Sequence, residues 1–203
     1  IMKKIVLSLA VLALSYSAQA QENPTYGFNE GDVMVEGSLQ VTTKDNKNTE
    51  VKTSKFVFNP KAGYFLSDKF AVGVELGIGT DKTENYGTIA PLSQISQKGN
   101  SFYVGAFGRY YFLDLGSRFK TYAEVGVGHS TSKSEEEILL VDGSSITTEA
   151  PKVNTVGFNA GLGFSYFVTP KIAINFGLTD ILSYNSSKSK ADGAKASNEF
   201  NAN

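Results

Sequence analysis

Apolar residues recur at every second position in seven separate stretches of the chain. In the clearest stretch, Phe70–Gly79, five large apolar side chains alternate with alanine, glycine and glutamate. An alternation of period two places the two kinds of side chain on opposite faces of a β-strand. The seven predicted strands are Val33–Thr42, Phe56–Phe65, Phe70–Gly79, Phe102–Phe112, Phe119–His129, Val156–Ser165 and Lys171–Thr179.

The connections between these stretches alternate between short and long. The short ones are 66–69, 113–118 and 168–170, and the long, polar ones are 44–55, 80–101 and 130–152. Outer-membrane barrels have short turns on the periplasmic side and long loops outside, with strands of about ten residues crossing the bilayer at a tilt. A soluble lipocalin-like barrel gives no reason to place every long loop at one end. The pattern therefore favours a transmembrane barrel.

Composition excludes several other classes. The chain has 20 Gly, 14 Phe and 10 Tyr, which favours strands and turns, and its net charge of −1 argues against a nucleic-acid partner. With no cysteine it can form neither a disulfide nor a thiolate metal site. No calcium-loop spacing is present either, so we expect no metal and no cofactor.

The first 20 residues have the three parts of a secretory signal peptide. Lys3 and Lys4 precede an apolar run, and Ala18-Gln19-Ala20 forms a small-x-small cleavage site. The run is too short to span a bilayer as a helix, which needs about 20 residues. We therefore expect residues 1–20 to be removed and residues 21–203 to form one barrel domain.

Aromatic residues gather beside the short connections. We expect them to form an interfacial girdle at the periplasmic side: Tyr64, Phe65, Phe70, Tyr110, Tyr111, Phe112, Phe119, Tyr166 and Phe167.

The chain continues past the seventh stretch through a polar loop, 185–198. The closing residues 199–203 alternate like the start of an eighth strand. Seven strands would leave unpaired edges in lipid, and bacterial single-chain barrels have even strand numbers. The predicted fold is thus an all-β, antiparallel, up-and-down eight-stranded transmembrane β-barrel with its last strand truncated.

One segment adds a family resemblance. Residues 59–73, NPKAGYFLSDKFAVG, are similar to the second hairpin of porin-family barrels from Bacteroidota-type bacteria. With the leader and the loop alternation, the chain resembles the small outer-membrane β-barrels, a group that includes OmpX-like, OmpW-like and OmpA N-terminal barrels. The resemblance implies a place in the bacterial outer membrane, contact with its lipid and lipopolysaccharide, and insertion by the barrel-assembly machinery.

Five charged residues fall at inward positions by parity: Glu36, Lys61, Glu75, Arg109 and Glu124. An eight-stranded barrel is only wide enough for side chains to fill its interior, so these charges should pair. We expect Arg109 between Glu75 and Glu124, and Lys61 beside Glu36. The set is interpreted as a plug of the lumen; the alternative is a gate that passes small ions. The inward glycines are expected to make room for large neighbours.

An enzyme is a further alternative that depends on the single histidine. His129 precedes Ser130 and an acidic run, and some barrel enzymes that act on lipid use a His/Ser/acid set at the outer rim. Parity places His129 toward lipid and Ser130 toward the lumen, however, which separates nucleophile from base. We expect no catalytic residues.

The long loops offer a different kind of function. The apolar stretch 138–141 could pair as a strand extension above the membrane and bind outside proteins by its edge. The sequence therefore predicts a non-enzymatic outer-membrane protein with a structural or surface-interaction role. A narrow porin-like channel for small or hydrophobic solutes is the alternative, and an extracellular protein or a small hydrophobic ligand could bind at the loops.

Overall fold

A computed structural model describes residues 25–87 and 92–203, which form nine β-strands. Their bounds are β1 Val33–Asn46, β2 Val51–Ser67, β3 Phe70–Asn85, β4 Leu92–Asp114, β5 Phe119–Leu140, β6 Ser145–Glu149, β7 Val153–Thr169, β8 Ile172–Ser189 and β9 Ser197–Ala202. Within the described ranges, no helix has the length and apolar character needed to cross a membrane. The predicted signal peptide, residues 1–20, lies outside the described residues.

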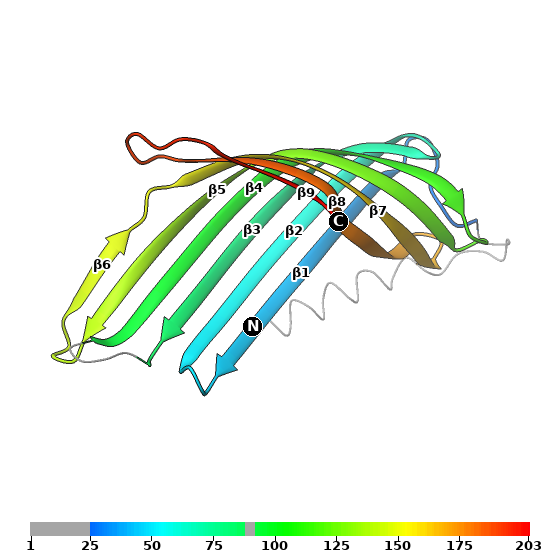
Figure 1. The fold of residues 1–203 in the computed structure, drawn as a ribbon. Coiled ribbons are helices and arrows are strands. Elements are labelled where there is room, and N and C mark those ends of the chain that lie inside the picture. Colours follow the sequence, from blue (N-terminus) through cyan, green and yellow to red (C-terminus); the bar gives the residue numbers. More distant parts are fainter. Residues whose placement is uncertain (1–24, 88–91) are drawn as a thin grey trace.

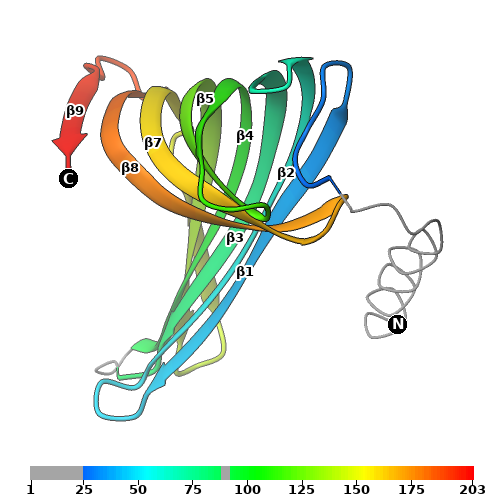
Figure 2. The ribbon, with the colours of Figure 1, turned by 90° about the vertical axis from the view of Figure 1, so that its right-hand side faces the viewer.

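All neighbouring strands pair antiparallel in the order β1-β2-β3-β4-β5-β7-β8-β9, and β6 pairs with β5 beside this path. The all-β, up-and-down class predicted from the sequence is confirmed. Six residues of β9 pair with Leu182–Ser187 of β8, which confirms a further strand at the closing residues. The loop predicted over 185–198 is shorter than expected, because β8 continues to Ser189 and β9 begins at Ser197. Among the described residues no pairing joins β9 to β1, so the sheet is an open, curved trough with these strands on opposite sides (Figure 2).

The strands are much longer than the sequence pattern predicted. The segments expected as long loops, 44–55, 80–101 and 130–152, are mostly strand, and β4 and β5 remain paired from Leu92↔Leu140 to Asp114↔Lys120. Apart from the apolar residues around Ile138, these extensions are polar on both faces, so they carry no period-two signal, although their backbones pair like the rest. The expected pairing of the apolar stretch near Ile138 is confirmed, since this residue lies between Ile95 of β4 and Ile146 of β6.

The extended parts of β1–β5 run beyond the trough as a long arm (Figures 1 and 2). We call this part the strand extension; it comprises 43–46, 51–55, 80–85, 92–101, 130–140 and β6. Six stretches of β-strand thus stand outside the band of exposed apolar residues that ends near Val41, Ile78 and Phe102. The three short turns lie at the other end of the trough.

The aromatic residues beside the short turns divide between the two faces of the sheet. Tyr64, Phe70, Tyr110, Phe112 and Tyr166 are exposed on the outer face, as a girdle requires. Phe65, Tyr111 and Phe167 are buried on the inner face instead, and together with Met34, Phe107 and Tyr122 they form the core. The girdle prediction was wrong for these three, because each has the opposite parity to its exposed neighbour.

Candidate functional site: a charged layer on the inner face

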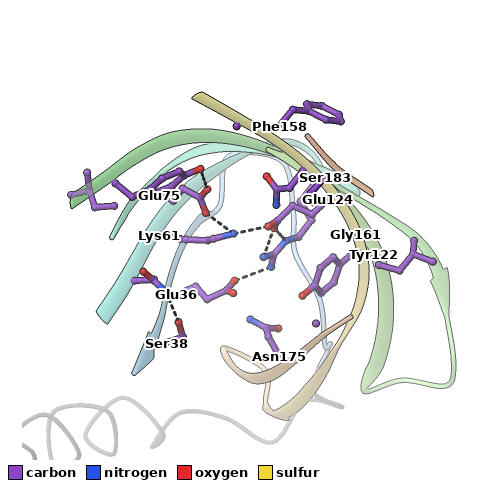
Figure 3. A pocket seen from close by; sticks show the side chains of 18 of the residues that line it. Glu36, Ser38, Lys61, Glu75, Tyr122, Glu124, Phe158, Gly161, Asn175 and Ser183 are labelled. Carbon is purple, nitrogen blue, oxygen red and sulfur yellow. Dashed lines mark hydrogen bonds and ion pairs between the residues drawn. The ribbon is translucent and has the colours of Figure 1, made fainter. Parts of the chain in front are cut away.

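The five charged residues predicted to face inward lie together on the concave side of the sheet. Lys61 on β2 reaches Glu75 on β3 and Glu124 on β5, with Nζ–O distances of 2.8 and 2.5 Å (Figure 3). Arg109 on β4 reaches Glu36 on β1 at 2.9 Å and Glu124 at 2.5 Å. We call these five residues, Glu36, Lys61, Glu75, Arg109 and Glu124, the ion-pair layer.

Burial makes the ion-pair layer unlike an ordinary surface salt bridge. The side chain of Arg109 is 2% exposed and that of Glu124 is 14% exposed. Exposed ion pairs contribute little to stability, whereas removing one partner of a buried pair leaves a charge without compensation. Three carboxylates and two cations make up the layer, so it keeps one net negative charge.

The pairing differs from the one predicted. The predicted contact of Arg109 with Glu124 is present, but the second partner of Arg109 is Glu36 and not Glu75. Lys61, predicted beside Glu36, bonds Glu75 and Glu124. Glu36 does stand opposite Lys61 in the register of β1 and β2. Lys61–Glu75 and Arg109–Glu124 are pairs between register partners on neighbouring strands. Lys61–Glu124 and Arg109–Glu36 reach across the trough instead, because curvature of the sheet brings β1 and β2 opposite β4 and β5. The parity of a residue predicts the face of the sheet on which its side chain lies, but not which side chain it meets across the trough.

Tyr103 belongs to the site and was missed at the sequence level. Its hydroxyl donates to Glu75 Oε1 at 2.5 Å, so both oxygens of Glu75 have a donor. Its ring lies over Gly105 and Gly128, where a Cβ atom would collide with it. The signal was present in the sequence: Tyr103 has the inward parity of Arg109, and two glycines flank the space that its ring occupies.

The inner glycines have the role expected of them. A Cβ at Gly163 would meet the ring of Tyr122, and one at Gly73 would meet Phe107 and the backbone of β2. Tyr122 in turn lies under the Arg109 guanidinium, 4.1 Å from its carbon to the ring centroid. Such cation–π contact stabilises a buried guanidinium.

A hydrogen-bonded chain extends the layer to the remaining strands. Arg109 Nη1 donates to the Tyr111 hydroxyl at 3.4 Å, which is 3.4 Å from Ser165 Oγ on β7. Ser165 is fully buried and donates to Asn175 Oδ1 on β8 at 2.6 Å. Polar contacts therefore reach from β1 to β8 across the interior.

Two features border the ion-pair layer. On the side of the short turns lie the buried aromatic rings, with Phe28 from the segment before β1 stacked on Phe65 at 4.1 Å between centroids. On the other side is a cavity of about 600 Å³ whose walls carry Ser38, Asn59, Asn159 and Asn185. Phe28 could not be found from the strand pattern, because it lies outside every alternating stretch.

The histidine does not assemble a catalytic set. Its Nε2 lies 3.4 Å from Thr131 Oγ1, on the outer face where Val125 and Val127 are exposed. Ser130 follows on the opposite face of β5 and pairs with Tyr103 and Thr155 in the register. Among the residues that the structure describes, no group of three or more histidine, cysteine or acidic side chains could hold a metal ion.

Comparison with known proteins agrees with this architecture. The family model described as outer membrane protein beta-barrel domain matches residues 6–203. No curated protein matches the chain.

Proposed function

Since the chain belongs to the outer membrane protein beta-barrel domain family and is an integral outer-membrane barrel protein, we propose that it has a non-enzymatic, structural or surface-interaction role and that charged side chains plug its interior. The observation that carries this proposal is the burial of Arg109 between Glu36 and Glu124. The ion-pair layer acts as the plug.

Closure follows from how completely the charges are paired. Each oxygen of Glu75 and Glu124 accepts a hydrogen bond or ion pair from Lys61, Arg109 or Tyr103. An ion entering from the cavity would have to replace these partners before it could pass. Leaving one member of a buried ion pair without its partner costs about 3–5 kcal/mol. That barrier favours a static plug over a gate that opens in thermal fluctuations.

A narrow channel is the competing function, and the cavity of about 600 Å³ favours it. Its walls of serine and asparagine would suit small polar solutes, so only the ion-pair layer and the rings beneath it separate the cavity from the short-turn side.

Solute efflux from liposomes distinguishes the two functions. Proteoliposomes are loaded with radiolabelled glycine or glucose, and with a small apolar dye for the hydrophobic alternative. A closed barrel releases each probe no faster than protein-free liposomes do. Release that scales with the amount of inserted protein would contradict the plug and support the channel. Folding is verified in the same sample by the heat-dependent shift of mobility on gels that intact barrels give.

The strand extension supplies the surface for the interaction role. The edge strand of this surface is β6, whose five residues are all exposed. β6 pairs with β5 on one side. An exposed strand edge offers backbone donors and acceptors to an added strand from another protein. We place outside proteins at this edge, lipid and lipopolysaccharide around the apolar band, and the barrel-assembly machinery at insertion.

Deleting 136–148 tests the interaction role. Cells that display the shortened barrel should adhere less to a surface coated with serum proteins, while insertion stays normal. Unchanged adhesion would remove the interaction role and leave the structural one. The control shortens the β1–β2 tip by deleting 47–49, which leaves β6 intact.

Substitution of His129 tests the non-enzymatic assignment. We expect His129→Ala to leave the lipid A profile of expressing cells unchanged by mass spectrometry. A change in acylation that requires His129 would contradict it.

A further inference from the structure

The segment before β1 crosses the short-turn end of the trough. We call Tyr26–Asp32 the N-terminal strap. On one side, the backbone N–H of Glu30 donates to Asp68 Oδ1 in the β2–β3 turn at 2.8 Å. On another side, the Tyr26 ring stacks with the guanidinium of Arg118 in the β4–β5 turn, 4.6 Å from the ring centroid. The strap is therefore tied to two different turns.

Between these ties the strap inserts one aromatic ring into the interior. The centroid of Phe28 lies 4.1 Å from that of Phe65, 5.0 Å from that of Tyr111 and 5.3 Å from that of Phe167. The three partners come from β2, β4 and β7, on separate parts of the curved sheet. Phe28 therefore fills the space that these inner rings surround.

The strap forms no strand, so no ladder of backbone hydrogen bonds holds residues 26–30. Its path relies on Gly27 and Gly31, whose φ angles of 127° and 88° are ones that other residues rarely adopt. Two hydrogen bonds join it to the Phe65 backbone, from Gly31 N to Phe65 O and from Phe65 N to Asp32 O, both 2.9 Å. Detaching residues 26–30 would leave every strand pair of the sheet in place.

We propose that the N-terminal strap is a detachable seal of the short-turn mouth, in series with the ion-pair layer. The inference rests on the proposed function in one respect: the ion-pair layer must block the path that leads from the short-turn mouth to the cavity. The order of the barriers follows from the strands: Phe65 lies near the turn end of β2, and Lys61 lies four residues further in. The two barriers block the same path between the short-turn end and the cavity, so loss of one alone does not join the two ends. Release of the strap exposes the inner aromatic rings on the short-turn side.

The absence of cysteine from the sequence allows a direct test. Ser165 is fully buried, and its Oγ lies 3.4 Å from the hydroxyl of Tyr111, whose ring Phe28 contacts. A Ser165→Cys reporter is treated in detergent micelles with a bulky, charged maleimide. The labelling rate of the reporter is measured in three proteins: one with Phe28 intact, one with Phe28→Ala and one with Phe28→Tyr. The control reporter is Ser38→Cys in the cavity wall, on the far side of the ion-pair layer.

The expected result is slow labelling of the Ser165→Cys reporter in the intact protein and about tenfold faster labelling with Phe28→Ala, because local opening sets the rate. Phe28→Tyr keeps the ring and should restore slow labelling. The Ser38→Cys reporter should label at one rate in all three proteins, which excludes general loosening of the barrel.

Two outcomes overturn the strap as a seal: a rate at Ser165→Cys that Phe28→Ala does not change, or fast labelling when Phe28 is intact. Failure of the ion-pair layer is recognised separately, with Arg109→Ala. If that variant does not raise labelling of the Ser165→Cys reporter, the layer is no barrier, whatever the strap does.

Discussion

Arg109 holds one oxygen of Glu124 with two of its nitrogens, Nε at 2.7 Å and Nη2 at 2.5 Å. The other oxygen of Glu124 accepts from Lys61 at 2.5 Å. Glu124 therefore joins the two cations of the ion-pair layer, one from β4 and one from β2. A carboxylate with two buried or half-buried cations fixes the relative position of strands that are not neighbours in the sheet.

Removing the Arg109 guanidinium should destabilise the barrel. Arg109→Ala leaves Glu36 and Glu124 with a lost partner each, and loss of one member of a buried ion pair costs about 3–5 kcal/mol. The free energy of unfolding is measured by urea titration in lipid vesicles. The matched control is Lys47→Ala at the β1–β2 tip, whose 85% exposed side chain pairs only with Asp45. We expect no measurable change from the control, and equal effects of the two substitutions would contradict the role of burial.

Gly128 should tolerate no side chain while Tyr103 is present. A Cβ there would collide with the Tyr103 ring, and overpacking of this kind costs about 1–3 kcal/mol. In a Tyr103→Ala background, Gly128→Ala should cost much less, so the two substitutions should be strongly non-additive in unfolding measurements. Gly108→Ala is the control, because its nearest neighbour is Phe70 at an ordinary 3.7 Å. Additive effects would show that Tyr103 does not occupy this space.

Phe65 and Phe70 lie close together in the chain but should respond differently to truncation. Phe65 is fully buried on the inner face, whereas Phe70 is 37% exposed on the outer face. Phe65→Ala should lower the free energy of unfolding by about 3–5 kcal/mol, as truncation of a core aromatic does. Phe70→Ala should cost clearly less. Urea titration measures both, and a larger loss at Phe70 would restore the girdle interpretation for Phe65.

The sequence was sufficient to predict the faces of the membrane-facing strands. Alternation places Val72 and Val74 outward and Glu75 inward, because a strand has a period of two whatever its surroundings. It could not predict the strand extension, since residues such as Lys82 and Glu84 are polar on a face where no hydrophobic contrast marks the strand. Backbone pairing continues there because the preceding hairpin already sets the register.

The Arg109–Glu124 pair was predicted from the sequence, but the contacts of the ion-pair layer across the trough were not. Glu36 and Lys61 are directly opposite in register, yet each pairs across the trough with a residue from another strand. These contacts depend on the curvature of the whole sheet, which no local segment encodes. The contacts of Phe28 could not be predicted for a related reason. Its partners are distant in sequence, and its own segment has no alternation of apolar and polar residues.

Glu84 in the strand extension provides a test by pH. Lys82 Nζ lies 2.5 Å from Glu84 Oε1, and this hydrogen bond holds the pKa of the Glu84 carboxyl below its usual range. The carboxylate is thus favoured in the folded state, so its contribution is present above the ordinary glutamate pKa and is lost as pH falls through the lowered one. NMR titration of the Glu84 carboxyl measures the pKa. Lys82→Met should return it toward the usual value, and an unchanged pKa would contradict the pairing.

The central claim is that the ion-pair layer closes the barrel. Single-channel conductance in a planar bilayer tests it most directly with the Phe28→Ala variant, because this substitution removes the strap ring and leaves the ion-pair layer as the remaining barrier. Insertion without current steps is the expected result. Adding Arg109→Ala should then produce salt-dependent, cation-selective steps, since Glu36, Glu75 and Glu124 outnumber the remaining Lys61. Steps of the same size in Phe28→Ala alone would contradict the claim that the ion-pair layer closes the barrel.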